Sequence, residues 1–259
     1  MVRILLFISI LFLPLASSAQ TKKELREIEL KGIVYKNEFS FGARVNTNGY
    51  TAFGEIARFR KVDLKQVFQI EYTYFKSFKE KKQPVLFSPS TFGSKKDYFY
   101  GKRNNFWTFR FNFGYRKEIA GKADKKGVTL SMVYMGGISL GFLKPYYLNL
   151  AIPGAEPSDQ PYSQPEKYSQ ENAERFLDKS QIDGASGIRY GWSDIEPVPG
   201  AHGKFGLNFD WASKDDFVKA LEVGASIDLY WRRIPIMVSD DGTRYYLGLY
   251  ASLQFGKRW

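Results

Sequence analysis

The segment Asn105–Arg116, with the sequence NFWTFRFNFGYR, decides the fold because its side chains alternate with a period of two. One face carries the aromatic residues Trp107, Phe109, Phe111, Phe113 and Tyr115. The opposite face carries Thr108, Arg110, Asn112, Gly114 and Arg116. Successive side chains of a β-strand point to opposite sides, so this pattern predicts a strand with one apolar and one polar face.

Similar alternation recurs along the chain and predicts eight strands. We expect them at about 38–45, 50–61, 68–74, 105–116, 129–141, 203–211, 219–231 and 244–256. The second strand is irregular, because Glu55 shares a face with Phe53, Ala57 and Phe59 and would be costly in lipid. A bulge or a shifted register would resolve that conflict.

The connections between these strands alternate in length. Short or polar turns are expected at 62–65, 118–127 and 213–217, whereas the other side carries the long loops 78–104 and 143–200. Long loops on one side and an even number of strands are typical of outer-membrane barrels. The sequence therefore predicts an all-β fold, an eight-stranded antiparallel up-and-down transmembrane β-barrel with two long extracellular loops.

A soluble, lipocalin-like barrel is the alternative, since its strands alternate too, with the apolar face inward. Aromatic residues at strand ends favour the membrane, as interfacial girdles do: Trp107, Tyr115, Trp211 and Trp231. Arginine together with carboxylates near mid-strand suits a salt-bridged interior, and the chain ends in a strand bearing Phe255 and Trp259. We therefore expect a protein of the cell outer membrane.

The first residues are expected to direct export. Arg3 precedes an apolar run at 4–15, and small residues at 16–19 offer a cleavage site. This is typical of a signal peptide, and a retained signal anchor is the alternative. We expect a signal peptide at 1–19, a short periplasmic segment at 20–33 and the barrel at 34–259.

Composition limits the chemistry of the 259-residue chain. It has no cysteine, which excludes disulfides and thiolate nucleophiles, and one histidine, which argues against a histidine-rich metal site. We expect no metal and no cofactor. The net charge of +11 is explained more simply by basic loops at an anionic outer leaflet than by nucleic acid, which we do not expect as a partner.

Several segments carry a resemblance to known proteins. They are the terminal strand YYLGLYASLQFGKRW (245–259), GGISLGFLKPYYLNL (136–150), EKYSQENAERFLD (166–178) and DWASKDDFVKALEVG (210–224). With the signal peptide, they resemble outer-membrane β-barrel proteins of Bacteroidota, in a conserved-hypothetical group of small barrels. The resemblance covers about Val34 to Trp259 and implies the fold, but it brings no activity.

The polar strand faces predict a charged network inside the barrel. Its expected members are Glu38, Arg44, Arg58, Glu71, Arg110, Arg116, Lys204, Asp210, Glu222 and Asp228. An eight-stranded barrel is just wide enough for side chains to fill it, so we expect a plugged core. A narrow channel for protons or small ions is the alternative.

The single histidine, His202, is the weak candidate for catalysis. It is expected just before a strand near the outer interface, with Ser193, Asp194 and Glu196 close in sequence. Such a set suits a lipid-modifying hydrolase, but no G-x-S-x-G nucleophile motif is present. We expect an exposed loop histidine and no enzyme activity, with the hydrolase as the alternative.

The two long loops differ in charge. The first is basic through Lys79, Lys81, Lys82, Lys95, Lys96, Lys102 and Arg103, which would suit the phosphates of lipopolysaccharide and other outer-membrane lipids, or would simply be solvated. The second is acidic, with a short helix expected at 169–178 and a Glu171–Arg175 pair. It could cap the barrel, pair with the basic loop or dock a protein partner. The sequence thus favours a structural or interaction component of the cell envelope.

Overall fold

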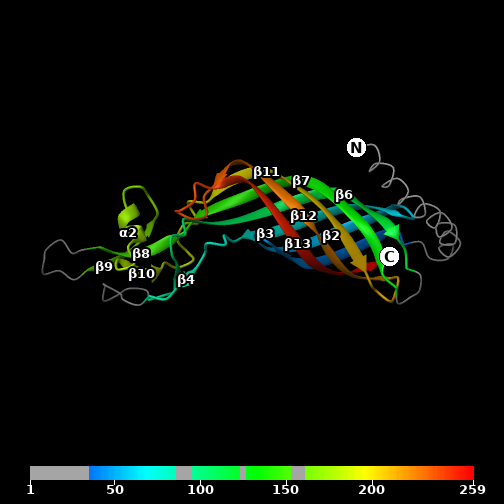
Figure 1. Cartoon of the computed structure of the whole chain (residues 1–259), viewed down its shortest axis with the longest axis horizontal. Helices are drawn as coiled ribbons and strands as arrows, with labels where there is room; N and C mark the ends of the chain where they lie inside the picture. The colour runs from blue at the N-terminus through cyan, green and yellow to red at the C-terminus, as the bar shows by residue number, and fades with distance from the viewer. Residues whose placement is uncertain (1–34, 86–94, 123–126, 153–160) are drawn as a thin grey trace, which may run out of the picture.

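The computed structural model describes residues 35–85, 95–122, 127–152 and 161–259. Eight long strands form a closed barrel (Figure 1): β1 (Asn37–Asn46), β2 (Gly49–Lys61), β3 (Leu64–Phe75), β6 (Asn104–Ala120), β7 (Thr129–Pro145), β11 (Glu196–Asp210), β12 (Phe217–Ile234) and β13 (Thr243–Arg258). The expected signal peptide at 1–19 and the segment at 20–33 lie outside the described residues.

Every strand of the barrel pairs antiparallel with two neighbours. The order around the barrel is β1-β13-β12-β11-β7-β6-β3-β2, so β1 and β13 close it, for example at Phe41 opposite Phe255. Closure satisfies the backbone hydrogen bonds of all eight strands, which is what a strand needs in lipid. The predicted eight-stranded antiparallel up-and-down barrel is confirmed.

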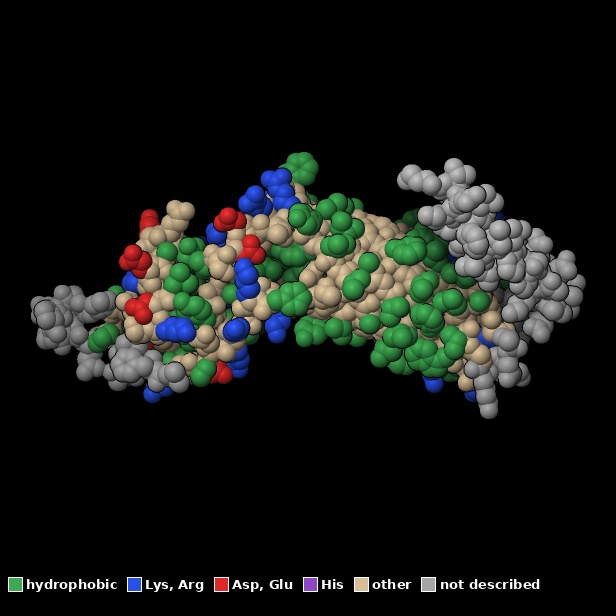
Figure 2. All heavy atoms as spheres, in the orientation of Figure 1, with side chains coloured by type: hydrophobic (Ala, Val, Ile, Leu, Met, Phe, Trp, Pro, Cys, Tyr) green, Lys and Arg blue, Asp and Glu red, His purple; other side chains and the backbone are tan. Residues whose placement is uncertain are grey.

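The outer surface of the barrel is apolar. Large hydrophobic side chains such as Phe41, Ile70 and Leu249 are exposed on it, whereas Glu38, Arg44 and many other polar residues are buried inside. Figure 2 shows hydrophobic side chains spread over the visible barrel wall, whereas most of the charged side chains in view lie at and beyond the ends of the barrel. This is the reverse of a soluble barrel, so the lipocalin-like alternative is wrong.

The second strand corrects one expectation. Phe53, Glu55 and Ala57 face the interior of the barrel, and Ile56 and Arg58 face outward. The pairing of β2 with β1 is regular throughout, and its pairing with β3 is regular as far as Phe59, with a register shift between Phe59 and Lys61. The inward position of Glu55 therefore needs neither a bulge nor a shifted register. Glu55 is costly only if its face meets lipid, and that face meets the charged interior instead.

Smaller elements within the two long connections form a lobe beyond one end of the barrel (Figure 1). They are β4 (Lys82–Gln83), β5 (Tyr98–Phe99), β8 (Tyr147–Ile152), β9 (Tyr162–Lys167), α2 (Ala173–Leu177) and β10 (Ile182–Ala185). We call these elements and the segments that join them the outer lobe. Strands β10, β8 and β9 make one sheet, and the lobe has its own core: Tyr98, Leu148, Leu150, Phe176 and Ile182.

The helix of the outer lobe is shorter than expected. It begins at Ala173 rather than Ser169, and Arg175 forms an ion pair with Glu166 at 3.3 Å instead of the expected Glu171. Within the described part of the chain, no helix is both long enough and apolar enough to cross a membrane.

Candidate functional site

The barrel interior gathers most of the charged residues that the strand pattern singled out. Buried there are Glu38, Arg44, Glu71, Arg110, Arg116, Lys204, Asp210, Glu222 and Asp228. Arg58 is exposed on the outside, so its place in the predicted network is wrong. The cause is the orientation of β2, in which odd-numbered residues such as Glu55 point inward.

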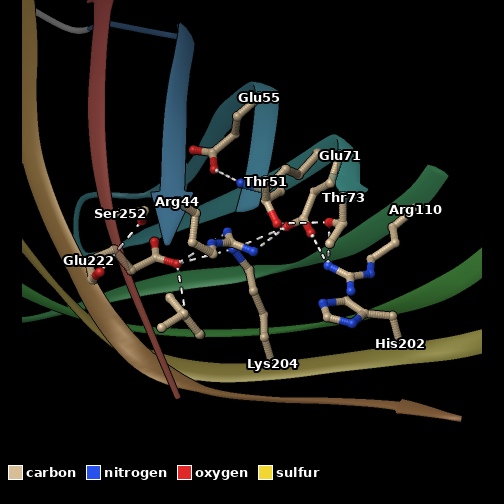
Figure 3. A network of polar contacts seen from close by, with 12 residues as sticks. Arg44, Thr51, Glu55, Glu71, Thr73, Arg110, His202, Lys204, Glu222 and Ser252 are labelled. Atoms are coloured by element: carbon tan, nitrogen blue, oxygen red, sulfur yellow. Dashed lines mark hydrogen bonds and ion pairs between the residues drawn. The ribbon is translucent and has the colours of Figure 1, made fainter. Parts of the chain in front are cut away.

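Glu71 lies at the centre of this network (Figure 3). Its carboxylate accepts hydrogen bonds from Arg44 Nη1 at 2.8 Å and Arg110 Nη1 at 3.1 Å, and Lys204 Nζ lies 3.8 Å away. Glu222 closes the other side, 3.0 Å from Lys204 Nζ. Strands β1, β3, β6, β11 and β12 each contribute one member. These contacts therefore join strands on several sides of the barrel across its interior.

A second group of charges lies in the barrel interior near the strand ends that the short turns connect. Glu38 accepts from Lys65 at 2.6 Å, from Arg258 at 2.8 Å and from Arg116 at 3.1 Å. Arg116 also lies 2.8 Å from Glu55. Because Arg116 lies 3.7 Å from Glu222, this group is continuous with the central one.

The charges of the interior balance. Among the described residues, the interior ion pairs of arginine and lysine involve six bases and six acids: Arg44, Lys65, Arg110, Arg116, Lys204 and Arg258, with Glu38, Glu55, Glu71, Asp210, Glu222 and Asp228. His202 adds a further contact to Asp228. A buried charge is tolerated when it is paired and hydrogen-bonded. The arrangement therefore supplies a filled and cross-linked core.

Three members of this network were missed by the sequence argument. The sequence alone puts Glu55 on an apolar face that would meet lipid, and Lys65 and Arg258 lie at strand ends, where charges usually meet solvent. Strand alternation did hold the signal for Glu55, since Gln69 and Glu71 occupy the inward face of the neighbouring strand.

His202 lies inside the barrel and not in an exposed loop. It belongs to β11 and is only 4% exposed, and its Nδ1 donates to Asp228 Oδ1 at 3.0 Å. Arg110 holds the same carboxylate, with Nε and Nη2 each at 2.8 Å. The expectation of an exposed histidine is wrong, because β11 begins at Glu196, earlier than the alternation alone indicated.

Asp194, which the sequence puts close to His202, has other partners in the structure. Asp194 belongs to the segment before β11, where it accepts hydrogen bonds from Tyr147 at 2.6 Å and Lys167 at 3.0 Å. The hydrogen bond to Asp194 raises the pKa of Tyr147 to about 12, and the same bond lowers the pKa of Asp194. Asp194 thus fastens parts of the outer lobe and is not a partner of His202.

An apolar layer covers the outer end of the charged network. It consists of Phe75, Phe106, Leu143, Val198, Tyr230, Ile234, Ile236 and Met237, with Tyr246 packed against it. The rings of Phe75 and Tyr246 lie 4.9 Å apart, and those of Phe106 and Tyr230 lie 5.0 Å apart. We call this layer the apolar cap. It lies between the charged network of the barrel interior and the outer lobe.

The basic residues of the first long loop do not share one environment. Lys102 is 1% exposed and pairs with Glu80 at 2.9 Å, so the prediction that it contacts lipid is wrong. Its ammonium group also lies over the ring of Phe99, 4.8 Å from the ring centre. The other members, Lys79, Lys81, Lys82, Lys95, Lys96 and Arg103, are exposed.

The two long loops pair with each other through their backbones. Lys95 N–H donates to Asp183 O at 3.0 Å, and Ala185 N–H donates to Lys96 O at 3.1 Å. Val238 N–H donates to Gly101 O at 2.8 Å, which adds the β12–β13 connection. The two long connections therefore form one body, the outer lobe, and the β12–β13 connection contacts it through Val238.

A closed barrel with an apolar exterior and a charged, filled interior defines the class of this protein: it is an outer-membrane β-barrel. Among the described residues, no group of three or more histidine or carboxylate side chains is placed to hold a metal ion. No family model matches the chain, and no curated protein matches it.

Solved structures with a similar backbone are outer-membrane barrels. Ail, the attachment invasion locus protein of Yersinia pestis in complex with the heparin analogue sucrose octasulfate, is 10% identical with a TM-score of 0.41, covering 88% of this chain and 100% of Ail. The N-terminal β-barrel domain of Pseudomonas aeruginosa OprF is 10% identical with a TM-score of 0.35, over 87% of this chain and 98% of that domain. The Neisserial surface protein NspA is 10% identical with a TM-score of 0.34, over 86% of this chain and 94% of NspA. The similarity is low, and no activity is transferred from it.

Proposed function

We propose that this protein is a non-enzymatic component of the cell envelope that docks a protein partner through its outer lobe. The observation that carries the proposal is a lobe with its own apolar core, held on a barrel whose interior is filled with paired charges. Ordering such a long connection costs conformational entropy, and long ordered loops are usually functional. A filled barrel leaves the lobe as the part best suited to interact.

The surface of the outer lobe supports this proposal. Tyr162 in β9 is exposed, and so are Ile188 and Tyr190 in the segment that follows β10, where Tyr190 packs against Tyr147 of β8. The exposed ion pair of Lys167 and Asp194 adjoins Tyr147 on the same surface. Exposed aromatic side chains within a polar surround are typical of binding surfaces, where aromatic residues contribute much of the affinity. Because the lobe is already folded, a partner would not pay the cost of ordering it.

Two other functions are less well supported. A lipid-modifying hydrolase would need His202 within reach of lipid, yet its side chain is buried in the barrel interior. A narrow channel would need a path past the apolar cap, and an apolar constriction opposes the passage of ions.

The lipid partner is part of the same proposal. The exposed residues Lys79, Lys81, Lys82, Lys95, Lys96 and Arg103 would meet lipopolysaccharide phosphates, with Lys102 left out. Membership of the Bacteroidota group of small barrels also remains a proposal, supported by the segments quoted from the sequence.

Deleting the part of the outer lobe that contains β8, β9, α2 and β10 tests the docking function. A variant in which a short Gly-Ser linker replaces residues 147–190 should keep the heat-dependent gel mobility of a folded barrel but lose stoichiometric co-purification of its partner. Lys214→Ala, at an exposed turn on the opposite end, is the control and should keep the partner. Co-purification that survives the deletion would refute docking through the lobe.

A further inference from the structure

The wall of the barrel is lowest at the turn between β1 and β2. Strand β1 ends at Asn46, opposite Tyr250, whereas β13 extends outward from there to Thr243. On the other side of the turn, Lys76 N–H donates to Asn48 O at 2.9 Å, and the chain continues upward from there. The outer part of β13 therefore lacks a β1 neighbour, which opens the wall sideways.

A cavity of about 260 Å³ lies in this opening, and we call it the rim groove. Asn48 forms its floor and donates to Leu247 O at 3.1 Å. Lys76, Ser77 and Phe78 line one side, and Thr243, Tyr245 and Leu247 line the other. Phe75, Ile234, Ile236 and Tyr246 form the back, so the apolar cap is also the rear wall of the groove.

The rim groove is continuous with the surface that faces lipid. Tyr245 is 63% exposed and Leu247 is 69% exposed, and Leu249 follows on the same outward face of β13. Phe78, on the opposite side, is 81% exposed. An apolar chain could therefore pass from the lipid-facing side of β13 into the groove along Leu247 and Tyr245.

A cationic side chain stands at one side of the entrance to the rim groove. The ammonium group of Lys76 is exposed there and, within the described residues, no carboxylate lies within ion-pair distance of it. The acidic member of the lining, Asp240, accepts a hydrogen bond from Gly242 N–H at 3.1 Å in its own turn. Tyr245 lies on the outward wall beside the groove, as interfacial aromatic residues do near lipid headgroups.

We propose that the rim groove binds one acyl chain of a phosphorylated outer-leaflet lipid, with the phosphate beside Lys76. The volume is below the range of about 300–1,000 Å³ that is usual for whole ligands, so the groove suits a single chain while the rest of the lipid stays in the membrane. This site is independent of docking through the outer lobe.

Native mass spectrometry of the full-length protein in mild detergent tests this proposal, with bis-phosphorylated lipid A as the probe. Lys76→Glu reverses the charge at the entrance and should weaken binding by about tenfold, which is the effect of about 1.4 kcal/mol. The matched control is Lys61→Glu, at an exposed position near the opposite end of β2, and it should stay within about twofold of the unaltered protein.

A second pair of variants tests the acyl chain. Leu247→Ser removes an apolar wall of the groove and should weaken binding several-fold, whereas Leu249→Ser, equally exposed on the same face but outside the lining, should not. All variants should keep the heat-dependent mobility of the folded barrel.

Two further probes separate the sources of the signal. Dephosphorylated lipid A should bind more weakly than the phosphorylated form, and inorganic phosphate alone should not compete. Equal binding by Lys76→Glu and Lys61→Glu, or full competition by inorganic phosphate, would overturn the proposal. So would equal binding by Leu247→Ser and Leu249→Ser.

Discussion

At the scale of single residues, the interior of the barrel depends on carboxylates that each serve several bases. Glu71 contacts Arg44, Arg110 and Lys204, so its negative charge is shared among three positive groups. Removing one partner from a buried ion network leaves the others desolvated and unpaired, which costs far more than the pair contributes. Individual residues of the network should therefore differ sharply in their effect on stability.

Glu71→Gln should lower the free energy of unfolding by about 3–5 kcal/mol, because it leaves buried cations without their shared charge. Unfolding by urea in detergent micelles would measure the loss. Arg58→Gln is the control and should change stability by less than about 0.5 kcal/mol, since Arg58 is exposed. A Glu71→Gln protein as stable as Arg58→Gln would contradict the account of the network.

His202→Ala should affect stability and leave lipids untouched. It removes the hydrogen bond to Asp228 and should cost about 1–3 kcal/mol, the penalty for a buried polar group left unpaired. Mass spectra of lipid A and phospholipids from cells that carry the variant should match those of cells with the unaltered protein. An altered lipid profile at normal protein levels would revive the hydrolase.

At the scale of elements, β2 shows that the packing against a neighbouring strand determines which side chains of a strand point into the barrel. Phe53 turns its ring inward, where Gly42 lies opposite it on β1 and provides the space. A Cβ added at Gly42 would collide with the Phe53 ring and the Leu253 carbonyl oxygen. At Gly54, the outward neighbour in the same pair of strands, nothing lies within 4 Å of such an atom.

Gly42→Ala should therefore destabilise the barrel by about 1–3 kcal/mol, as overpacking does. Gly54→Ala should be neutral or slightly stabilising, because alanine restricts the unfolded chain. The temperature at which the folded band disappears from an unboiled gel would rank the two. If Gly54→Ala proved the more harmful variant, the assigned faces of β2 would be wrong.

In the outer lobe, Tyr147 and Asp194 give a pH dependence. The hydrogen bond from Tyr147 lowers the pKa of Asp194, so this contact is complete above the ordinary pKa of an aspartate and is lost as the pH falls through the lowered value. Tyr147→Phe should return the pKa of Asp194 toward its ordinary value. A carboxyl titration followed by NMR would show the shift, and an unchanged Asp194 titration would contradict the contact.

At the scale of the whole molecule, the parts that repeat could be predicted and the parts that depend on single contacts could not. Strand alternation in segments such as Asn105–Arg116 defined the barrel, because lipid and a charged interior impose opposite demands on its two faces. The same rule assigned Glu71 and Arg110 to the interior. It failed for Arg58, since the mixed faces of β2 are resolved only by the neighbouring strands.

The outer lobe and the rim groove could not be predicted from strand alternation, and the cause differs from that for Arg58. Both are built from connections of different lengths that meet in space, as Lys95 meets Asp183 and Asn48 meets Leu247. Such contacts between distant segments leave no local period in the sequence. The burial of Lys102 against Glu80 and Phe99 is a further example.

The most direct test of the whole account is extraction of the native protein from membranes in mild detergent, followed by gels with and without boiling. We predict that the protein is recovered in the outer-membrane fraction and that boiling shifts its mobility on the gel, as expected for a closed barrel. We also predict that a protein partner is extracted with it in stoichiometric amount. A shift without a partner would contradict docking through the outer lobe. Recovery as a soluble periplasmic protein without a shift would contradict the membrane barrel itself.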